Sequence, residues 1–262
     1  MPEGHMIHRV ARDHNRLYRG QQLSVTSPQG RFQASATKLD AKTLERVDAY
    51  GKHLFYWWAG DQVLHIHLGL YGKFRNHRSP PPTPRGAVRL RVIGDTHAFD
   101  LNGPTACELI TPTQQIAIAD RLGADPLRKD ADIEQAWSRI SRSRSVIGKL
   151  LLDQSVIAGV GNVYRAEALF VNQLAPERAG QTLDRNQFDS LWQTLVAMLR
   201  IGVKYNRIIT ADPDEVGKPP SRMNRSERLL CYKKECCPRC KTAIKSWELG
   251  ARKMYACPAC QV

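Results

Sequence analysis

The sequence predicts an α+β protein with a mostly antiparallel β domain, a helical domain and a small cysteine-rich hairpin, in that order along the chain. Three observations lead to this fold class. Apolar and polar residues alternate in segments of the first 118 residues, which is the period of a half-buried strand. Apolar residues recur at helical spacing from residue 122 onward, and six of the seven cysteines follow residue 230. We therefore expect domains at residues 1–118, 119–229 and 230–262.

The β domain is expected to begin with a helix, because apolar residues from Glu3 to Arg19 recur at helical spacing and Gly20 supplies a stop. The spacing then changes to a period of two in four segments: residues 23–25, 47–49, 64–68 and 88–92. Gly51-Lys52 and Gly94-Asp95 lie between strand-like segments and predict hairpin turns. The proline-rich residues 79–84 predict a loop that interrupts the sheet.

The helical domain is expected to begin with a polar, charged helix that opens at residues 123–127, whose sequence is GADPL. An apolar helix is predicted at residues 146–152. The glycine-containing residues 158–162 then separate it from a further helix that runs through Phe170.

A long helix over residues 186–205 presents one apolar face, which indicates a packing role. Asp184 and Gln187 are spaced like an N-cap residue and its N3 partner. Residues 212–227 are rich in proline, glycine, serine and charge, and predict a loop that leads to the cysteine cluster.

The chain is strongly basic, with 39 Lys and Arg against 25 Asp and Glu, a formal charge of +14 and a sequence pI near 9.7. A polyanionic partner such as nucleic acid is the favoured interpretation. A charge that only aids solubility remains an alternative. The sequence has no run of 18 apolar residues and its first residues lack the apolar core of a secretory signal, so we expect a soluble, cytoplasmic protein that does not bind membranes.

Two CxxC pairs near the end of the chain predict one zinc ion. Sixteen residues separate the pairs, a spacing that suits four thiolates around one metal, and we expect the ion at the base of a two-stranded hairpin. The expected ligands are Cys237, Cys240, Cys257 and Cys260. Cys236 could compete with Cys237, Cys231 also lies close by, and a disulfide is the alternative chemistry. Four thiolates leave no open coordination position, so the zinc is structural.

The chemistry must then lie elsewhere, and the N-terminus offers it. Removal of the initiator Met would leave Pro2 with a secondary amine, whose pKa near 8 gives far more free base at neutral pH than a lysine with a pKa near 10.4. Such an amine can attack the anomeric carbon of a deoxynucleotide and form an iminium. Glu3 follows directly and can act as a general acid and base. The alternatives are a common Met-Pro start and a carboxylate that interacts favourably with a helix dipole.

Four motifs and the zinc hairpin occur in a characteristic order: MPEG, GKHLF, LGLYGKF and GVGNVYRAEALF precede the hairpin. Together they resemble the formamidopyrimidine-DNA glycosylase and endonuclease VIII family over essentially the whole chain. PEG after the Met, in place of PELPE, is more similar to the endonuclease VIII branch, whose members usually act on oxidised pyrimidines. The resemblance implies an N-terminal β-sandwich flanked by helices, a C-terminal helix-two-turn-helix domain with a zinc-finger hairpin, and DNA in the cleft between them.

The resemblance further implies a bifunctional DNA glycosylase and abasic-site lyase, monomeric, acting on damaged DNA, and nucleoid-associated if bacterial. Pro2 would form the Schiff base, Glu3 would act as acid and base, and strand cleavage would follow by β- or β,δ-elimination. Lys52 would reach a phosphate and assist protonation, or else is an exposed turn lysine. Leu70 and Tyr71 would fill the gap left by the extruded base, or else pack in the core.

The phosphates around the lesion would be bound by Lys149, Asn162 and Arg252. Asn162 stands at a predicted helix N-terminus, which favours anions, and its alternative is a simple N-cap. Arg252, at the hairpin tip, would also help the second elimination, and its alternative is a solvated turn cation.

The sequence departs from the family pattern at His5 and Met6, where many members have Pro and Glu, so a second acidic residue near the nucleophile is missing. Two other classes of function compete. A noncatalytic nucleic-acid-binding protein with a zinc ribbon explains the charge and the cysteines but not Pro2-Glu3. A metal hydrolase would use three strand histidines: His53, His65 and His67.

Overall fold

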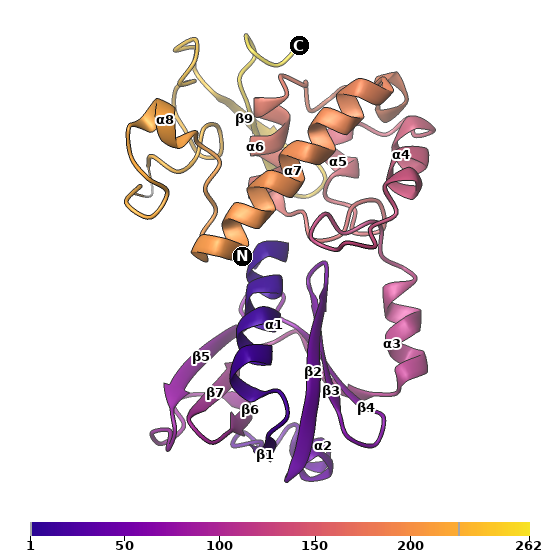
Figure 1. The fold of residues 1–262 in the computed structure, drawn as a ribbon. Helices are drawn as coiled ribbons and strands as arrows, with labels where there is room; N and C mark the ends of the chain where they lie inside the picture. The colour runs from indigo at the N-terminus through magenta and orange to yellow at the C-terminus, as the bar shows by residue number, and fades with distance from the viewer. Residues whose placement is uncertain (1, 225) are drawn as a thin grey trace. The chain divides into compact units, whose positions relative to one another are not determined.

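The computed structural model describes residues 2–224 and 226–262, and within it the chain divides into two compact units. The first unit contains the residues up to Glu3 and Ile7–Arg121, and the second contains Gly4–Met6 and Leu122–Val262 (Figure 1). The cysteine-rich segment is part of the second unit. Across the described residues, we find no helix long and apolar enough to cross a membrane.

The first unit is a β-sandwich built from one antiparallel eight-stranded sheet, in the order β5-β7-β6-β1-β2-β3-β4-β8. Strand β1 joins the two halves of the sheet, because it pairs with β6 on one side and, through only Gln22 and Leu23, with β2 on the other. The strands are β1 (Gln22–Thr26), β2 (Lys42–Tyr50), β3 (His53–Trp58), β4 (Gln62–His67), β5 (Lys73–Arg78), β6 (Val88–Ile93), β7 (His97–Asn102) and β8 (Ala106–Ile110).

The predicted first helix and both predicted hairpin turns are confirmed. Helix α1 (Gly4–Tyr18) lies against the sandwich (Figure 1). Its Asn15 side chain donates to the Val47 carbonyl of β2 at 2.6 Å and accepts from the Val47 amide at 2.8 Å. The buried His14 ring stacks on Phe99 of β7, with centroids 4.5 Å apart. These contacts fix the helix that follows the Pro2-Glu3 pair.

Two short helices of this unit do not follow from the sequence pattern. Helix α2 (Gln33–Leu39) buries only Ala36 and Leu39, and α3 (Pro112–Ala119) lies at the end of the predicted β domain. Helix α3 begins at a capping box, in which the Thr111 side chain accepts from the Gln114 amide and the Gln114 side chain accepts from the Thr111 amide.

The second unit is helical, with a two-stranded sheet near the end of the chain. Its elements are α4 (Ile133–Ser141), α5 (Ile147–Leu150), α6 (Asn162–Val171), the 3-10 turn Gly180–Thr182, α7 (Arg185–Tyr205), α8 (Pro213–Val216), β9 (Lys245–Glu248) and β10 (Lys253–Ala256). The capping box of Asp184 and Gln187 at the start of α7 is present as predicted. Helix α7 buries one face: Phe188, Leu191, Trp192, Leu195, Val196, Met198, Leu199 and Gly202.

The predicted start of the first helix at residues 123–127 is wrong. Ala124 instead forms an isolated parallel bridge with Ile157, and the first helix of this unit begins at Ile133. Pro126 disfavours a helical conformation at Asp125. The Asp132 side chain accepts from the Gln135 amide at 2.9 Å and so caps α4 instead.

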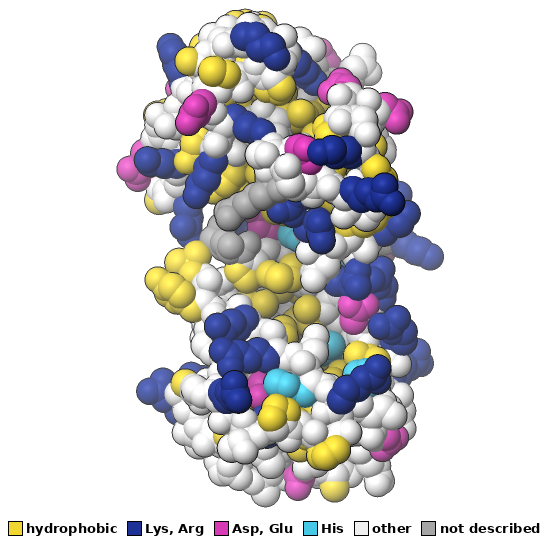
Figure 2. All heavy atoms as spheres, turned by 90° about the vertical axis from the view of Figure 1, so that its left-hand side faces the viewer, with side chains coloured by type: hydrophobic (Ala, Val, Ile, Leu, Met, Phe, Trp, Pro, Cys, Tyr) yellow, Lys and Arg dark blue, Asp and Glu magenta, His cyan; other side chains and the backbone are white. Residues whose placement is uncertain are grey.

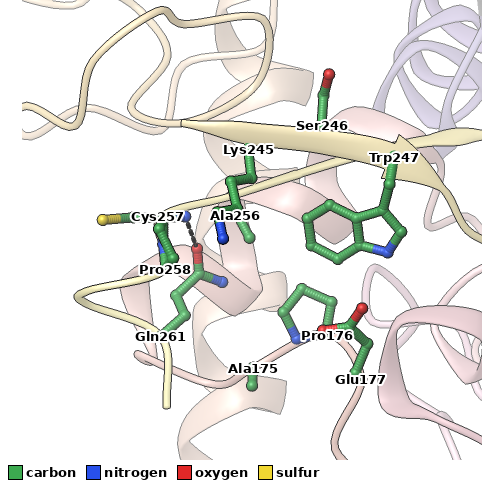
Figure 3. A pocket seen from close by; sticks show the side chains of 10 residues that line it. All are labelled: Ala175, Pro176, Glu177, Lys245, Ser246, Trp247, Ala256, Cys257, Pro258 and Gln261. Carbon is green, nitrogen blue, oxygen red and sulfur yellow. Dashed lines mark hydrogen bonds between the residues drawn. The ribbon is translucent and has the colours of Figure 1, made fainter. Parts of the chain in front are cut away.

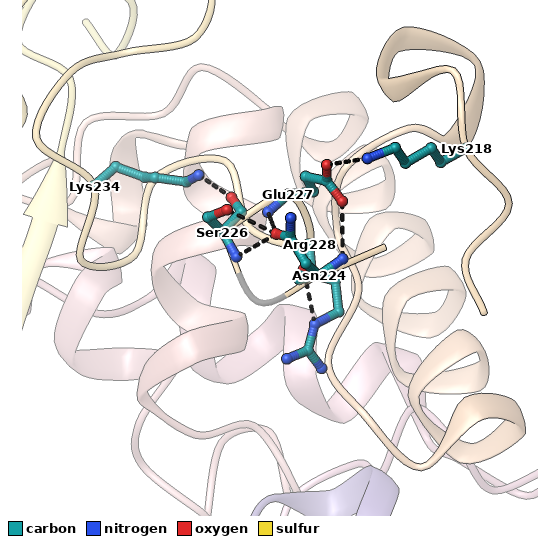
Figure 4. A network of polar contacts seen from close by, with 6 residues as sticks. All are labelled: Lys218, Asn224, Ser226, Glu227, Arg228 and Lys234. Atoms are coloured by element: carbon teal, nitrogen blue, oxygen red, sulfur yellow. Dashed lines mark hydrogen bonds and ion pairs between the residues drawn. The ribbon is translucent and has the colours of Figure 1, made fainter. Parts of the chain in front are cut away.

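Among its described residues, 212–224, 226 and 227, the predicted loop contains the short α8 and is organised by its own polar side chains (Figure 4). The Asn224 side chain accepts from the amides of Ser226 and Glu227, and the Glu227 carboxylate accepts from the Asn224 amide at 2.8 Å. Lys218 forms an ion pair with the same carboxylate. The described residues of this loop are therefore held by side-chain contacts, and α8 is the longest helix among them.

Candidate functional site

The predicted nucleophile and its acid directly precede α1. Glu3 is the N-cap residue, with an extended backbone, and it is only 1% exposed. The Gly4 amide, grouped with the second unit, donates to the Gly159 carbonyl at 2.8 Å. A Cβ at Gly4 would lie 2.9 Å from the Gly159 Cα, so this close approach requires glycine. A buried carboxylate at the positive end of a helix can hold or deliver a proton next to the chain terminus.

His5, which departs from the family pattern, is almost fully buried. Its ring meets the Tyr164 ring edge-on, with centroids 5.4 Å apart, and burial lowers the His5 pKa to about 4. A Cβ at Gly202 would lie 2.8 Å from the His5 Cβ. His5 is therefore a neutral packing residue near pH 7 and does not replace the missing carboxylate.

Lys52 lies in the tight turn between β2 and β3, where Gly51 has a φ of +57°. The next residue, His53, places its Nδ1 2.9 Å from the Nε2 of His65. Burial, followed by the charges of His67 and His65, lowers the His53 pKa to about 3, and burial lowers the His65 pKa to about 4. These rings are therefore neutral near pH 7 and add no positive charge beside Lys52.

The loop at residues 68–72 exposes two large apolar side chains. Leu70 is 49% exposed and Tyr71 is 84% exposed, so the alternative that they pack in the core is wrong. Gly69 has a φ of +64°, and a Cβ at Gly72 would lie 2.3 Å from the Leu68 carbonyl oxygen. The glycines thus permit a tight loop that leaves both apolar side chains exposed.

In the second unit, the structure brings together the elements that carry Lys149, Asn162 and Arg252. Lys149 is exposed on α5, and Arg252 is exposed in the turn between β9 and β10. Asn162 is the first residue of α6 and Gly161 is the N-cap, so the alternative of a simple N-cap is wrong for Asn162. Its side chain donates to the Lys253 carbonyl at 2.9 Å and so connects α6 to the hairpin.

Two buried charges on α6 did not stand out in the sequence, although both belong to the motif GVGNVYRAEALF. Arg165 donates to the Asn162 side chain and to three backbone carbonyls. Glu167 accepts from three backbone amides of the segment that leads to the cysteines, and from the Thr210 hydroxyl. A charged residue at a position where the helix periodicity places core residues is the signal that could have indicated them.

Lys and Arg side chains are spread over the visible face of both units, with fewer Asp and Glu between them (Figure 2). This distribution agrees with the formal charge of +14. Each unit therefore offers a surface that attracts a polyanion.

The four predicted cysteine ligands form a group whose sulfur atoms all lie within 4.8 Å of one another. The Sγ atoms of Cys237 and Cys260 are 3.8 Å apart, and those of Cys240 and Cys257 are 3.4 Å apart. Tetrahedral coordination with metal–sulfur bonds of about 2.3 Å places sulfurs about 3.8 Å apart, so the group fits such a metal ion.

Cys236 and the strand histidines lie outside this group. The Cys236 backbone bridges to Ala243. Among residues 2–224 and 226–262, the side chains grouped to hold a metal are the four cysteines, without His53, His65 or His67. The metal-hydrolase alternative therefore gains no support. Cys107 is 8% exposed in β8, as expected for a small buried side chain.

A cavity of about 530 Å³ lies between the hairpin and the segment after α6 (Figure 3). It is lined by Ala175, Pro176, Glu177, Lys245, Ser246, Trp247, Ala256, Cys257, Pro258 and Gln261. The Gln261 side chain accepts from the Cys257 amide at 2.9 Å and donates to the Leu174 carbonyl at 3.0 Å. These contacts place the end of the described chain against the cysteine site.

Comparisons with known proteins agree over both units. The formamidopyrimidine-DNA glycosylase N-terminal domain matches residues 1–104, and the formamidopyrimidine-DNA glycosylase H2TH domain matches residues 122–214. The chain is 44% identical to Endonuclease 8 1 of Mycobacterium tuberculosis over 267 residues, with 100% of both chains covered. The chain belongs to the formamidopyrimidine-DNA glycosylase and endonuclease 8 family. It is also 30% identical to Endonuclease 8 of Pectobacterium carotovorum, with 100% of both covered.

The fold of this family member is also that of solved structures. A complex of Lactococcus lactis Fpg with DNA containing an abasic site has a TM-score of 0.80 and 23% identity, over 99% of each chain. A structure of MutM with DNA containing carbocyclic 8-oxo-G has a TM-score of 0.81 and 23% identity. The resemblance inferred from the motifs and the α+β fold class are confirmed. Family membership makes the protein a DNA glycosylase, which decides against the noncatalytic zinc-ribbon alternative.

Proposed function

We propose that this family member is a bifunctional DNA glycosylase and abasic-site lyase that excises oxidised bases, pyrimidines in preference, with Pro2 as the nucleophile. The observation that carries the proposal is the Pro2-Glu3 pair directly before α1, with the Glu3 carboxylate buried at the N-cap. The 44% identity with relatives named Endonuclease 8 1 favours pyrimidine lesions.

The proposed chemistry starts at the secondary amine of Pro2, once the initiator Met is removed. The amine attacks C1′ of the damaged nucleotide, the bond from C1′ to the base breaks, and the base leaves with a proton supplied by Glu3. The nitrogen lone pair then opens the C1′–O4′ bond of the sugar, and the proton that the amine has lost passes to O4′. The resulting iminium acidifies C2′. Loss of a C2′ proton then breaks the C3′–O bond in β-elimination, and a second elimination releases the other phosphate.

The other proposed roles follow from where each side chain lies. Lys52, in the tight hairpin turn, would contact a phosphate and assist protonation. Leu70 and Tyr71, exposed on their glycine-rich loop, would occupy the space left by the extruded base. On the second unit, the phosphates around the lesion would be bound by Lys149, Asn162 and Arg252.

We assign the metal at the four cysteines as one structural zinc ion, because a set of four thiolates is typical of structural zinc. The sulfur spacing fits this ion, and the Thr242 hydroxyl oxygen lies 3.3 Å from the Cys240 Sγ. Hydrogen bonds with the side chain and backbone of Thr242 lower the pKa of Cys240 and so favour its thiolate form.

Borohydride trapping tests the proposal. The protein should form a covalent complex with duplex DNA that carries an oxidised pyrimidine or an abasic site, and Pro2→Gly should abolish it. Lys149→Ala should retain trapping at low salt but weaken DNA binding in a salt-dependent way. Binding without any trapped complex would refute the Schiff-base mechanism.

Glu3→Gln separates base removal from strand cleavage. Because Glu3 is proposed to protonate the leaving base, the substitution should slow excision from oxidised DNA more than cleavage of a preformed abasic site. An equal loss on both substrates would contradict that role.

A further inference from the structure

Arg165 lies fully buried on α6, at the centre of the elements that carry the proposed phosphate-binding residues. Its side chain is 0% exposed. Its Nη1 donates to the carbonyls of Gly148 at 3.0 Å and Leu249 at 2.9 Å. Its Nη2 donates to the Asn162 side-chain oxygen at 2.6 Å and to the Lys253 carbonyl at 3.2 Å. One guanidinium therefore connects α5, α6 and both ends of the β9–β10 turn.

Each acceptor is next to, or part of, a proposed phosphate contact. Gly148 directly precedes Lys149, and the Asn162 side chain is itself an acceptor. Leu249 and Lys253 enclose the turn that carries Arg252. The hydrogen bonds of Arg165 thus fix the backbone on which all three proposed contacts stand.

The packing around this guanidinium shows why one side chain can reach all these segments. A Cβ at Gly148 would lie 2.7 Å from the Leu249 side chain, so the missing side chain lets α5 approach the hairpin closely. A Cβ at Gly250 would lie 3.4 Å from the Lys149 side chain, at the other end of this contact. Small residues bring the segments together, and Arg165 supplies the polar contacts between them.

We propose that Arg165 is a positioning residue for DNA binding, which holds Lys149, Asn162 and Arg252 in the arrangement that fits the phosphates around the lesion. This inference rests on the proposed phosphate contacts. A guanidinium suits the task because it is a rigid planar fork with five N–H donors, whereas a lysine ammonium has three and a different shape. Since Arg165 is fully buried, it acts through these residues and does not itself contact DNA.

The salt dependence of DNA binding separates positioning from a general loss of stability. Arg165→Met should weaken binding to an abasic-site duplex at least tenfold. The slope of log K against log salt should fall by about 1 to 2, because each lost phosphate contact removes about 0.9. Destabilisation alone would lower the active fraction and the melting temperature, but the active molecules would keep the original slope.

Two further variants make the comparison specific. Arg185→Met is the matched control, because it removes an arginine from an exposed ion pair with Glu134 in the same unit, and it should leave the slope unchanged. Arg165→Lys keeps the charge but not the fork, and should give an intermediate affinity. If Arg165→Met does not fold, the lysine variant carries the same test. An original slope and affinity in Arg165→Lys would overturn the proposal.

A double-variant cycle distinguishes this inference from the function on which it rests. Arg252→Ala should reduce the DNA affinity less in the Arg165→Met background than in the unaltered protein, because the phosphate contact of Arg252 is already impaired there. Arg252→Ala and Lys149→Ala could each weaken DNA binding as much in the Arg165→Met background as in the unaltered protein. This result would overturn the positioning role but leave the phosphate contacts in place. If neither single variant changes the affinity, the phosphate contacts fail, and the positioning role fails with them.

Discussion

Replacing Glu167 by Gln should destabilise the cysteine-rich end of the chain. Glu167 is 0% exposed, and its Oε1 accepts from the amides of Cys231 at 2.9 Å and Tyr232 at 2.6 Å. Its Oε2 accepts from the Leu230 amide at 2.8 Å and from the Thr210 hydroxyl. One carboxylate on α6 therefore anchors the segment that enters the metal site.

The size of the effect follows from these four contacts. The glutamine oxygen can still accept from the two amides that donate to Oε1. Its NH2 group then faces the Leu230 amide, and these two groups cannot form a hydrogen bond because both are donors. The Thr210 hydroxyl can rotate and accept instead. One buried amide loses its partner, and two hydrogen bonds lose their charged acceptor, for which we expect a loss of about 2–4 kcal/mol.

Denaturant unfolding of the metal-loaded protein measures this difference in the free energy of unfolding. Glu177→Gln, at an exposed position of the same unit, is the matched control and should stay within about 0.5 kcal/mol. The Glu167→Gln variant should also lose its metal to a chelator faster than the unaltered protein does. A Glu167→Gln protein as stable as this control would refute the reasoning.

Three further predictions concern the loop, the metal and the histidines. Tyr71→Ala should lower the rate of base excision about tenfold but change the unfolding free energy by less than about 0.5 kcal/mol, because Tyr71 is exposed. Leu70→Ala should act in the same direction. An unchanged rate of excision would exclude a role of these side chains in filling the space left by the base. Cys240→Ser should lower the metal content below one ion per chain and lower the melting temperature, whereas full retention would show that Cys240 is not a ligand. Because burial lowers the His53 pKa from 6.5 to about 3, the unfolded state binds more protons between these values, and stability should fall as the pH drops through this range. His53→Gln should make this fall shallower, and an identical pH profile of unfolding would contradict the assignment.

The sequence predicted the elements in which one rule of periodicity or capping dominates. Helix α1 and the box of Asp184 and Gln187 are such cases, because apolar spacing and cap chemistry act locally. Strand β5 had no such signal, because its side chains are mostly exposed and polar, and only its pairing with β7 defines it. The helix expected to open at residues 123–127 begins at Ile133 instead, because Pro126 disfavours a helical start and Asp132 supplies the cap.

In the candidate site, too, features with a local sequence signal could be predicted, and features that depend on tertiary contacts could not. The family resemblance implied roles for Lys149, Asn162 and Arg252, which stay predictions, and the CxxC spacing predicted the four cysteines that the structure brings together. The periodicity of α6 could have indicated a buried charge at Arg165, but not its partners, because the acceptors in Gly148, Leu249 and Lys253 are backbone carbonyls, whose positions do not depend on residue identity. The exposure of Tyr71 likewise follows from the local backbone and not from its apolar character.

Mass spectrometry of the borohydride-reduced enzyme–DNA complex, after digestion of both components, most directly tests the central claim. The account predicts that the reduced sugar is attached to the nitrogen of Pro2, on a peptide that has lost Met1. A sugar found on a lysine, or full trapping by a protein that retains Met1, would contradict it.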